Sequence, residues 1–292
     1  MDVRIKRMNS GRGGDCHLII GTEGAAAVDA GMAYGGPGLV ELIRRELSGQ
    51  PLDYVLLTHS HYDHIGGVPY LKEAWPDVKI CGALRAKEVL ERPGALRTIR
   101  SLSEGAATEY MGEEYQFLAY RDEDLKIDTP LWEGDEVSLG KPSIRVLYTP
   151  GHTHCSLSYY LREEEIMFPC ESIGCYIGNG VMVSPILTAF SDALNSIEKC
   201  RTYQPKRVIS PHYGEVRGIA PDQYFDLARE EAFAVRDFVL ELSGRGLSDE
   251  QLLSAFTDRF WTQRRAVKSE QPMAAFTINA KATIRAVLKE FL

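Results

Sequence analysis

Five of the seven histidines in this 292-residue chain lie in three short segments. The first segment is His59-Ser60-His61-Tyr62-Asp63-His64, which places four side chains that can bind a metal within six residues. The others are Thr149-Pro150-Gly151-His152 and Ser210-Pro211-His212-Tyr213-Gly214. Neutral imidazole and carboxylate are ligands that divalent zinc, iron and manganese accept. The pattern therefore predicts a metal site built from distant parts of the chain.

The chemistry expected of such a site is hydrolysis. A bound divalent ion lowers the pKa of a water molecule from about 15.7 to about 7, and two ions about 3.5–4 Å apart can share the resulting hydroxide. In an extended segment His59 and His61 point the same way, because side chains alternate with a period of two. Asp63 and His64 follow one turn later and can face a second ion. The residues favour a two-metal hydrolytic site.

The elements around the first segment suit a functional loop. Residues 52–57 form a compact apolar run that is typical of a buried strand. Residues 67–75 have the pattern of a helix that ends before Pro76, and residues 78–81 that of a further strand. The histidines of the first segment would therefore follow the carboxyl end of a strand, where α/β proteins often carry functional loops.

The remaining pattern separates a mixed region from a helical one. Short strands and helices alternate up to the third histidine segment, with a hairpin signal at residues 21–24 and a helix over 39–47. From Asp222 onward no strand pattern appears, and a capping box at Ser248-Asp249-Glu250-Gln251 precedes a further helix. Residues 274–292 complete the helical region.

Composition narrows the class of protein. A formal charge of −8 disfavours an extended basic surface for nucleic acid, and no apolar run approaches the roughly 20 residues that span a bilayer. Four of the first seven residues are charged, which is unlike an apolar leader, so we expect a cytoplasmic protein without nucleic-acid or membrane partners. The six cysteines include no CxxC pair and are expected to be reduced packing residues.

The motif His59-x-His61-x-Asp63-His64, together with His152 and His212, resembles the metallo-β-lactamase-fold hydrolase superfamily over residues 3 to about 214. The resemblance implies an α/β fold, an αββα sandwich of two mixed sheets flanked by helices. Residues 1–220 would be the catalytic domain and residues 221–292 a C-terminal helical extension covering the active site. The resemblance also implies two groups of metal ligands: His59, His61 and His152 for one ion, and Asp63, His64 and His212 for the other.

The residue that would bridge the two ions departs from the family pattern. The family places an aspartate in a Gly-Asp-Thr-like motif, whereas the corresponding stretch here is Phe168-Pro169-Cys170-Glu171-Ser172. The resemblance puts Glu171 at the bridge, one methylene longer than aspartate, which leaves open whether both sites fill. Cys170 is expected to pack, because neighbouring residues of a strand face opposite sides.

Asp29 and His154 each allow a functional and a structural interpretation, whereas His17 is expected to be structural only. Asp29 resembles an early Asp-x-Gly turn of the family, where it would orient a ligating histidine, but it could equally cap its own turn. His154 could contact substrate or metal, or be an ordinary loop histidine. His17 lies in an apolar strand and is expected to be structural.

Among superfamily members, the chain most resembles thioesterase-like proteins, including the quinolone-signal response protein and glyoxalase II. The first similarity rests on Pro69-Tyr70-Leu71 after the histidines and on the helical tail, and residues 211–215 depart from glyoxalase II. The resemblance implies an enzyme that cleaves an acyl thioester or related ester with metal-bound hydroxide, positioned by Asp63 and Glu171. Its cofactors would be two divalent ions, with zinc expected and iron or manganese as alternatives.

Other functions stay open at this point. The chain could be a phosphodiesterase or lactonase of the same fold. It could also be a metal-containing regulatory or ligand-binding protein with incidental hydrolysis. In that case aromatic residues of the tail would form a contact surface instead of a core: Phe225, Phe233, Phe238, Phe256, Phe260 and Trp261. The expected partner is a small acyl thioester or ester, while the substrate itself, the native metal and a homodimeric state are not determined.

Overall fold

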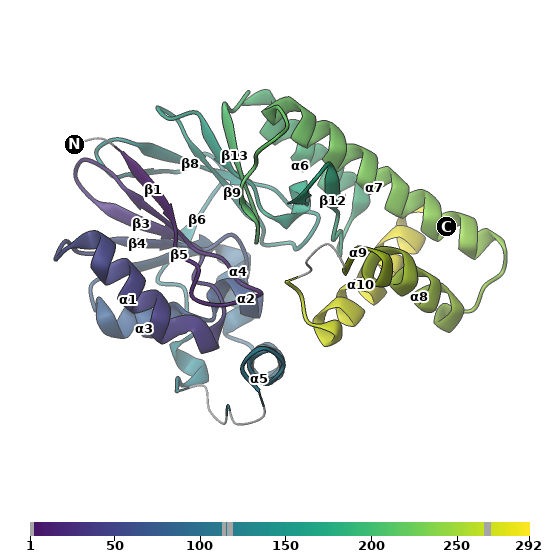
Figure 1. Cartoon of the computed structure of the whole chain (residues 1–292), viewed down its shortest axis with the longest axis horizontal. Helices are drawn as coiled ribbons and strands as arrows, with labels where there is room; N and C mark the ends of the chain where they lie inside the picture. The colour runs from purple at the N-terminus through teal and green to yellow at the C-terminus, as the bar shows by residue number, and fades with distance from the viewer. Residues whose placement is uncertain (1–2, 113–114, 116–118, 266–269) are drawn as a thin grey trace. The chain divides into compact units, whose positions relative to one another are not determined.

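The computed structural model describes residues 3–112, 115, 119–265 and 270–292. The chain divides into two compact units, which are described separately (Figure 1). The first comprises Met1–Leu147 and Leu157–Glu165, and the second comprises Tyr148–Ser156 and Ile166–Leu292. Each unit contains strands, helices and part of the predicted histidine set.

The first unit is built on a six-stranded mixed sheet in the order β1-β2-β3-β4-β5-β6. The first three strands are antiparallel, and the pairs from β3 to β6 are parallel. The predicted turn at residues 21–24 joins β2 to β3 and is closed by a 2.8 Å hydrogen bond from Gly21 N to Gly24 O. The strands are β1 Arg4–Arg7, β2 His17–Ile20, β3 Ala25–Val28, β4 Tyr54–Leu56, β5 Lys79–Ala83 and β6 Thr129–Leu131.

Helices cover this sheet and carry the first histidine segment. Figure 1 shows α1 (Gly36–Leu47) and α3 (Val68–Ala74) side by side along the sheet, and α1 buries Leu39, Ile43 and Leu47. This spacing of four residues is that of one apolar helix face. The short helix α2 (Tyr62–Ile65) carries Asp63 and His64 and contacts α5. Helix α4 (Leu84–Leu90) stops before α5 (Pro93–Met111), which begins at the proline because proline is tolerated in a first turn.

The remaining strands of the first unit form an antiparallel hairpin and a neighbour. β7 (Glu136–Ser138) pairs with β8 (Ser143–Tyr148), and β9 (Leu157–Leu161) follows β8 in the strand order. All five side chains of β9 are buried. Short 3₁₀ turns at Ala33–Gly35 (η1) and Asp122–Asp124 (η2) complete the unit.

The second unit contributes three strands of a mixed six-stranded sheet and also contains a hairpin and a pair of packed helices. β13 (Arg207–Ser210) pairs in parallel with β10 (Ile166–Phe168) and antiparallel with β14 (Gly214–Glu215). The 3₁₀ turn η3 (Glu171–Ile173) follows β10 and leads into the hairpin of β11 (Cys175–Gly178) and β12 (Val181–Val183). Helix α6 (Phe190–Thr202) packs against α7 (Pro221–Gly244).

The C-terminal region of the second unit is a helical core. Helix α8 (Asp249–Thr257) begins at the predicted capping box, with Ser248 Oγ accepting from Gln251 N. A π-helical turn η4 (Asp258–Thr262), α9 (Gln263–Arg265) and α10 (Met273–Phe291) follow. The aromatic residues predicted to be either contact surface or core mostly take the second role: Phe225, Phe256 and Trp261 are buried, and Phe233, Phe238 and Phe260 pack against buried clusters.

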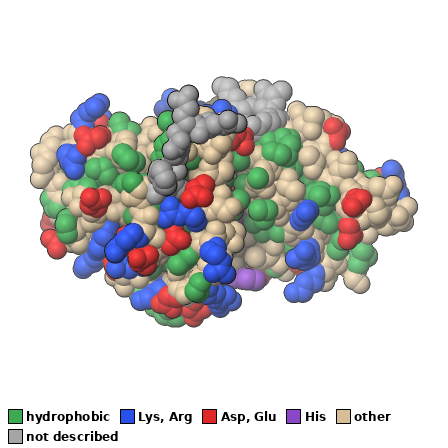
Figure 2. Space-filling view, turned by 90° about the horizontal axis from the view of Figure 1, so that it is seen from below, with side chains coloured by type: hydrophobic (Ala, Val, Ile, Leu, Met, Phe, Trp, Pro, Cys, Tyr) green, Lys and Arg blue, Asp and Glu red, His purple; other side chains and the backbone are tan. Residues whose placement is uncertain are grey.

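The predicted α/β class is confirmed, with mixed sheets, flanking helices and C-terminal helices. The domain boundary at residue 220 and the covering of the active site by residues 221–292 stay predictions. All six cysteines are buried and none of them forms a disulfide in the described structure, as expected of packing residues. Among the described residues no helix has both the length and the apolar composition needed to cross a bilayer. On the face in Figure 2 basic and acidic side chains are interspersed over the coloured, described residues.

Candidate metal centre

The loop that carries the first histidines is anchored on both sides by buried hydrogen bonds. Leu57 N donates to Cys81 O at 2.8 Å, and Tyr159 Oη donates to Leu57 O at 2.7 Å. Leu157 N donates to Thr58 O at 2.7 Å. The chain therefore leaves β4 in a fixed direction, as the buried apolar strand in the sequence predicted.

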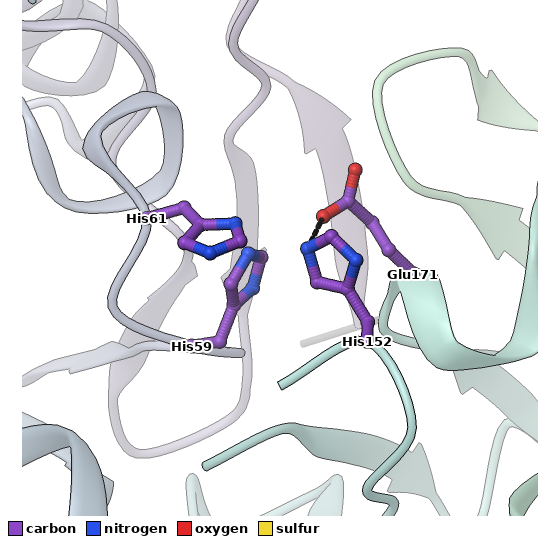
Figure 3. Close-up of side chains that lie close together, drawn as sticks. All are labelled: His59, His61, His152 and Glu171. Atoms are coloured by element: carbon purple, nitrogen blue, oxygen red, sulfur yellow. Dashed lines mark ion pairs between the residues drawn. The ribbon is translucent and has the colours of Figure 1, made fainter. Parts of the chain in front are cut away.

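The imidazoles of the first segment gather at the end of this strand. The ring centroids of His59 and His61 are 4.5 Å apart, and those of His59 and His64 are 4.1 Å apart. Figure 3 shows the rings of His59 and His61 next to each other. Asp63 Oδ2 lies 3.8 Å from His64 Nε2. All four predicted ligands of the first unit are thus grouped.

Asp29 determines how two of these imidazoles present their nitrogen atoms. Its Oδ2 lies 2.9 Å from His64 Nδ1, and because an ionised carboxylate only accepts, Nδ1 of His64 carries a proton. Its oxygens also accept from the Thr58 backbone N at 2.8 Å and from Thr58 Oγ1 at 2.8 and 3.0 Å. The Asp29 side chain therefore supports His64 and Thr58 together.

Thr58 extends this effect to His59. Its hydroxyl has one proton, which goes to Asp29, so Thr58 Oγ1 must accept from His59 Nδ1 at 3.1 Å. In both His59 and His64 the Nδ1 proton leaves the lone pair on Nε2, the state in which imidazole binds a metal. Of the two interpretations of Asp29, orientation of the histidines is the one the contacts support.

In the second unit a tight turn positions His152. Gly151 has φ of 133°, and a Cβ atom there would lie 2.6 Å from the Ala193 backbone of α6. Gly151 O accepts hydrogen bonds from Leu187 N at 3.1 Å and from Thr188 N at 3.0 Å. Only glycine fits this conformation and this contact, which accounts for its place before the histidine.

The ring of His152 is held in a defined tautomer. Its Nδ1 lies 2.7 Å from the carbonyl oxygen of Pro185, which can only accept, and its backbone N donates to Ser172 Oγ at 2.8 Å. Nε2 of His152 is therefore left with a lone pair when the ring is neutral. His152 itself is fully buried.

Glu171 presents one carboxylate oxygen to each of two histidines. Oε2 lies 2.5 Å from His152 Nε2, the pair joined by the dashed line in Figure 3. Oε1 lies 2.9 Å from His212 Nε2. At this distance the Oε2 atom of Glu171 and the Nε2 lone pair of His152 repel each other, because both are hydrogen-bond acceptors. A proton or a cation between them would remove this repulsion. Imidazole nitrogen and carboxylate oxygen are both ligand types that a divalent metal ion accepts.

Burial also raises the pKa of two tyrosine phenols in the second unit. The pKa of the Tyr213 phenol, next to His212, is raised mainly by burial and further by Cys175 and Glu270. Burial likewise raises the pKa of Tyr224, whose Oη donates to Gly174 O at 2.6 Å. Both phenols therefore stay protonated at neutral pH and act only as neutral hydrogen-bonding groups.

The other sequence interpretations can now be compared with the structure. His17 is buried in β2 and burial lowers its pKa, as expected of a structural histidine. His154 is exposed, and its carbonyl oxygen accepts from Tyr148 Oη at 3.1 Å. Cys170 is buried with Sγ 3.2 Å from Thr149 Oγ1, which agrees with packing.

The seven predicted ligands are divided between the two compact units. The first unit carries His59, His61, Asp63 and His64, and the second carries His152, Glu171 and His212. Their roles as ligands, and those of Asp63 and Glu171 in catalysis, stay predictions. Thr58 and the Pro185 carbonyl were not found by sequence reasoning, since neither residue type is itself a metal ligand signal.

Comparison with known proteins supports a hydrolase relationship. The chain is 29% identical over 169 residues to the metallo-beta-lactamase fold-containing protein ST1585 of Sulfurisphaera tokodaii, covering 56% of this chain and 62% of that protein. The ST1585 crystal structure covers 98% of both chains with a TM-score of 0.60 at 20% identity, which is a likeness of fold.

Two enzymes are also similar. An atrochrysone carboxyl ACP thioesterase of Aspergillus fumigatus is 26% identical over 60% of this chain and 32% of its own length. A hydroxyacylglutathione hydrolase of Legionella pneumophila is 30% identical over a match that covers 48% of this chain and 39% of that enzyme. The matched region thus spans about a third to three fifths of these curated relatives. The expectation of a hydrolase agrees with the names of both enzymes.

A family model gives the broadest match. The model of the metallo-beta-lactamase superfamily covers residues 9–212, from the loop after β1 to the third histidine segment. This is well over half of the chain and includes all seven predicted ligands. The chain therefore belongs to the metallo-beta-lactamase superfamily.

Proposed function

We propose that this protein is a metal-dependent hydrolase that cleaves an acyl thioester or a related ester. The observation that carries the proposal is the Glu171 carboxylate, which faces His152 with one oxygen and His212 with the other. Such a carboxylate suits a bridge between two cations, and the family relationship supplies the class of reaction. The thioester preference is supported by the similarity to a thioesterase and a hydroxyacylglutathione hydrolase.

The proposed cofactors are two divalent ions, with zinc as the first candidate and iron or manganese as alternatives. One ion would be held by His59, His61 and His152, the other by Asp63, His64 and His212, with Glu171 between them. When bound, the ions would lower the pKa of a water molecule and polarise the scissile carbonyl.

The chain's own residues have three tasks in this proposal. Asp29 and Thr58 hold His64 and His59 with Nε2 available, and the Pro185 carbonyl does the same for His152. The carboxylates of Asp63 and Glu171 would position the attacking water, and Asp63 would take up its proton. The burial of His59, His152 and Glu171 limits bulk water, which strengthens these charge interactions.

The test is metal analysis joined to a substrate panel. Protein purified anaerobically should contain close to two divalent ions per chain by mass spectrometry and should hydrolyse acyl-CoA or aryl ester substrates. His61→Ala should lower both metal content and turnover, whereas His154→Ala, which changes an exposed histidine, should lower neither. A metal-loaded protein that turns over no acyl thioester or ester would refute the proposal.

The same panel addresses the other functions. Bis-p-nitrophenyl phosphate tests a phosphodiesterase and a homoserine lactone tests a lactonase, and turnover of either alone would replace the proposal. The regulatory alternative depended on an exposed aromatic surface in the tail, and most of those residues pack in the described core. The proposed partner is therefore a small acyl thioester or ester, in a cytoplasmic setting.

A further inference from the structure

Arg12 lies on the glycine-rich loop between β1 and β2 and is held at two points. Its carbonyl oxygen accepts from Tyr34 Oη at 2.6 Å, and its guanidinium carbon lies 5.0 Å from the centroid of the Tyr110 ring. The Tyr34 and Tyr110 rings are themselves in contact, with centroids 6.1 Å apart. The backbone of Arg12 is therefore hydrogen-bonded to one ring of this aromatic pair, and its side chain is stacked on the other.

This loop passes directly beside the segment that carries Asp63 and His64. A Cβ atom on Gly14 would lie 2.7 Å from Asp63 O and 2.6 Å from Met32 N, so the two backbones touch. Two residues of extended chain span at most about 7 Å, which places Arg12 close to the same segment. Helix α5, which carries Tyr110, also contacts α2. All of these residues belong to the first compact unit.

The guanidinium of Arg12 is available for a ligand. Its side chain is exposed, and among the residues that the structure describes no carboxylate lies within ion-pair distance of it. By contrast, Arg7 on the neighbouring strand is paired with Asp15 at 2.8 Å. A cation that is stacked on an aromatic ring, rather than neutralised by a carboxylate, retains its planar set of N–H donors.

We propose that Arg12 binds an anionic oxygen group of the substrate and so gives the enzyme a preference for anionic acyl esters and thioesters. This inference rests on the proposed hydrolase function and adds the charge of the substrate to it. Guanidinium donors match the two oxygens of a carboxylate or phosphate in geometry and charge. The stacked position over Tyr110 restricts the side chain beforehand, so that less conformational freedom is lost on binding.

The experiment compares matched anionic and neutral substrates. For a carboxylate in the acyl part, the pair is the mono-p-nitrophenyl ester of glutarate and p-nitrophenyl butyrate. For phosphate in the leaving group, the pair is butyryl-CoA and butyryl-N-acetylcysteamine. Arg12→Ala should raise KM for the anionic member of one pair by roughly 10- to 100-fold, the range expected for loss of a charged hydrogen bond. The neutral members should change by less than about twofold.

Three variants separate this role from a general effect. Arg97→Ala removes an exposed arginine from the same helix α5, about 20 Å along the helix from Tyr110 at 1.5 Å per residue, and should change nothing. Tyr110→Leu removes the ring beneath Arg12 and should give part of the loss. Arg12→Lys keeps the charge without the planar donors and should retain part of the preference.

A binding measurement keeps the inference testable if turnover is absent. Isothermal titration calorimetry with glutarate and with coenzyme A should show that the wild type binds at least one of the two anions, and that this binding is weakened in Arg12→Ala but not in Arg97→Ala. Hydrolysis of all substrates with no change in the anionic preference on Arg12→Ala would overturn the inference and leave the proposed function standing. Anion binding that depends on Arg12, without hydrolysis of any substrate, would support the role of Arg12 and refute the proposed function.

Discussion

Replacing Asp29 by asparagine should weaken metal binding while leaving the protein folded. The change keeps the size of the side chain, and asparagine tolerates the left-handed backbone at this position, where φ is 59°. It replaces one acceptor oxygen by an NH₂ group that cannot accept from His64 Nδ1. If the amide oxygen stays on Thr58, the NH₂ group faces His64 and favours the ring tautomer with the proton on Nε2.

That tautomer cannot bind a metal through Nε2, so the substitution should lower the affinity of the protein for the metal. The charged hydrogen bond of 2.9 Å between Asp29 and His64 corresponds to about 1.5–3 kcal/mol. Loss of a partner that orients a metal-bound histidine typically lowers metal affinity roughly 10- to 100-fold. The two figures agree, because 1.4 kcal/mol equals a factor of about ten in an equilibrium constant.

Asp29→Ala should behave differently from Asp29→Asn. Alanine removes the acceptor of the buried Thr58 backbone N and adds a Cβ-only residue at a positive φ. We expect the free energy of unfolding of the metal-free protein to fall by about 3 kcal/mol, from the unsatisfied donor and the backbone strain together. Asp53→Asn is the matched control, since Asp53 Oδ2 accepts from Ala25 N at 2.8 Å and no histidine is involved.

The assay is competition for zinc against a chromogenic chelator, with urea unfolding of each metal-free variant. The reasoning predicts that Asp29→Asn loses zinc affinity, whereas Asp53→Asn keeps it despite its own cost in stability. Zinc affinity of Asp29→Asn within twofold of the wild type would refute the tautomer argument, and equal losses in both variants would attribute the effect to stability.

Three further changes have defined outcomes. Glu171→Gln removes the charge facing His152 and His212, so zinc content by mass spectrometry should fall and turnover should drop about 100-fold or more; undiminished zinc would contradict the bridging role. Burial raises the pKa of Glu231 above 4.5, although Arg264 opposes the shift, so its stabilising contribution is present at acidic pH and is lost as pH rises through the folded-state pKa. Urea unfolding from pH 4.5 to 7 should therefore show the wild type losing stability relative to Glu231→Gln; a constant difference would exclude this linkage. Tyr224→Phe should lower the free energy of unfolding by about 1–2 kcal/mol, measured the same way, because the buried Gly174 carbonyl loses its 2.6 Å donor.

The sequence was sufficient for the parts of the site that depend on local pattern. The strand at β4, the loop with His59 and His61 and the helix α3 follow from apolar periodicity and from the proline at residue 76. The helical C-terminal region followed from the same periodicity and from the capping box at Ser248. These features need no knowledge of distant contacts.

Short elements were missed for identifiable reasons. Helix α2 has four residues, which is too few to show a helical period. β6 contains Pro130, which argues against a strand, and it is tolerated because β6 is at the edge of its sheet. The hairpin of β11 and β12 carried a usable signal in Asn179-Gly180, where both residues have positive φ.

The network behind the histidines could be read from sequence only in part: orientation of a ligating histidine was one of two interpretations of Asp29, and neither its partner His64 nor the role of Thr58 was identified. Asp29 reaches His64 across 35 positions of the chain, and Thr58 passes the effect on to His59. The carbonyl of Pro185 holds His152 with a backbone atom, which any residue would supply. Such contacts depend on how the folded segments meet, and residue type alone does not indicate them.

The glutamate at position 171 is explained by its place in the fold. It opens the 3₁₀ turn η3, which is separated from the end of β10 by two residues, and Ile173 N donates to the O atom of Cys170, the residue before the turn, at 3.0 Å. The longer side chain lets its two oxygens reach His152 and His212, which lie on different loops of the second unit. The extra methylene also adds a rotatable bond, so the carboxylate must be held by its partners more than a shorter aspartate would be. Ser172 next to it binds the His152 backbone at 2.8 Å, which ties the turn and the histidine loop together and limits that freedom.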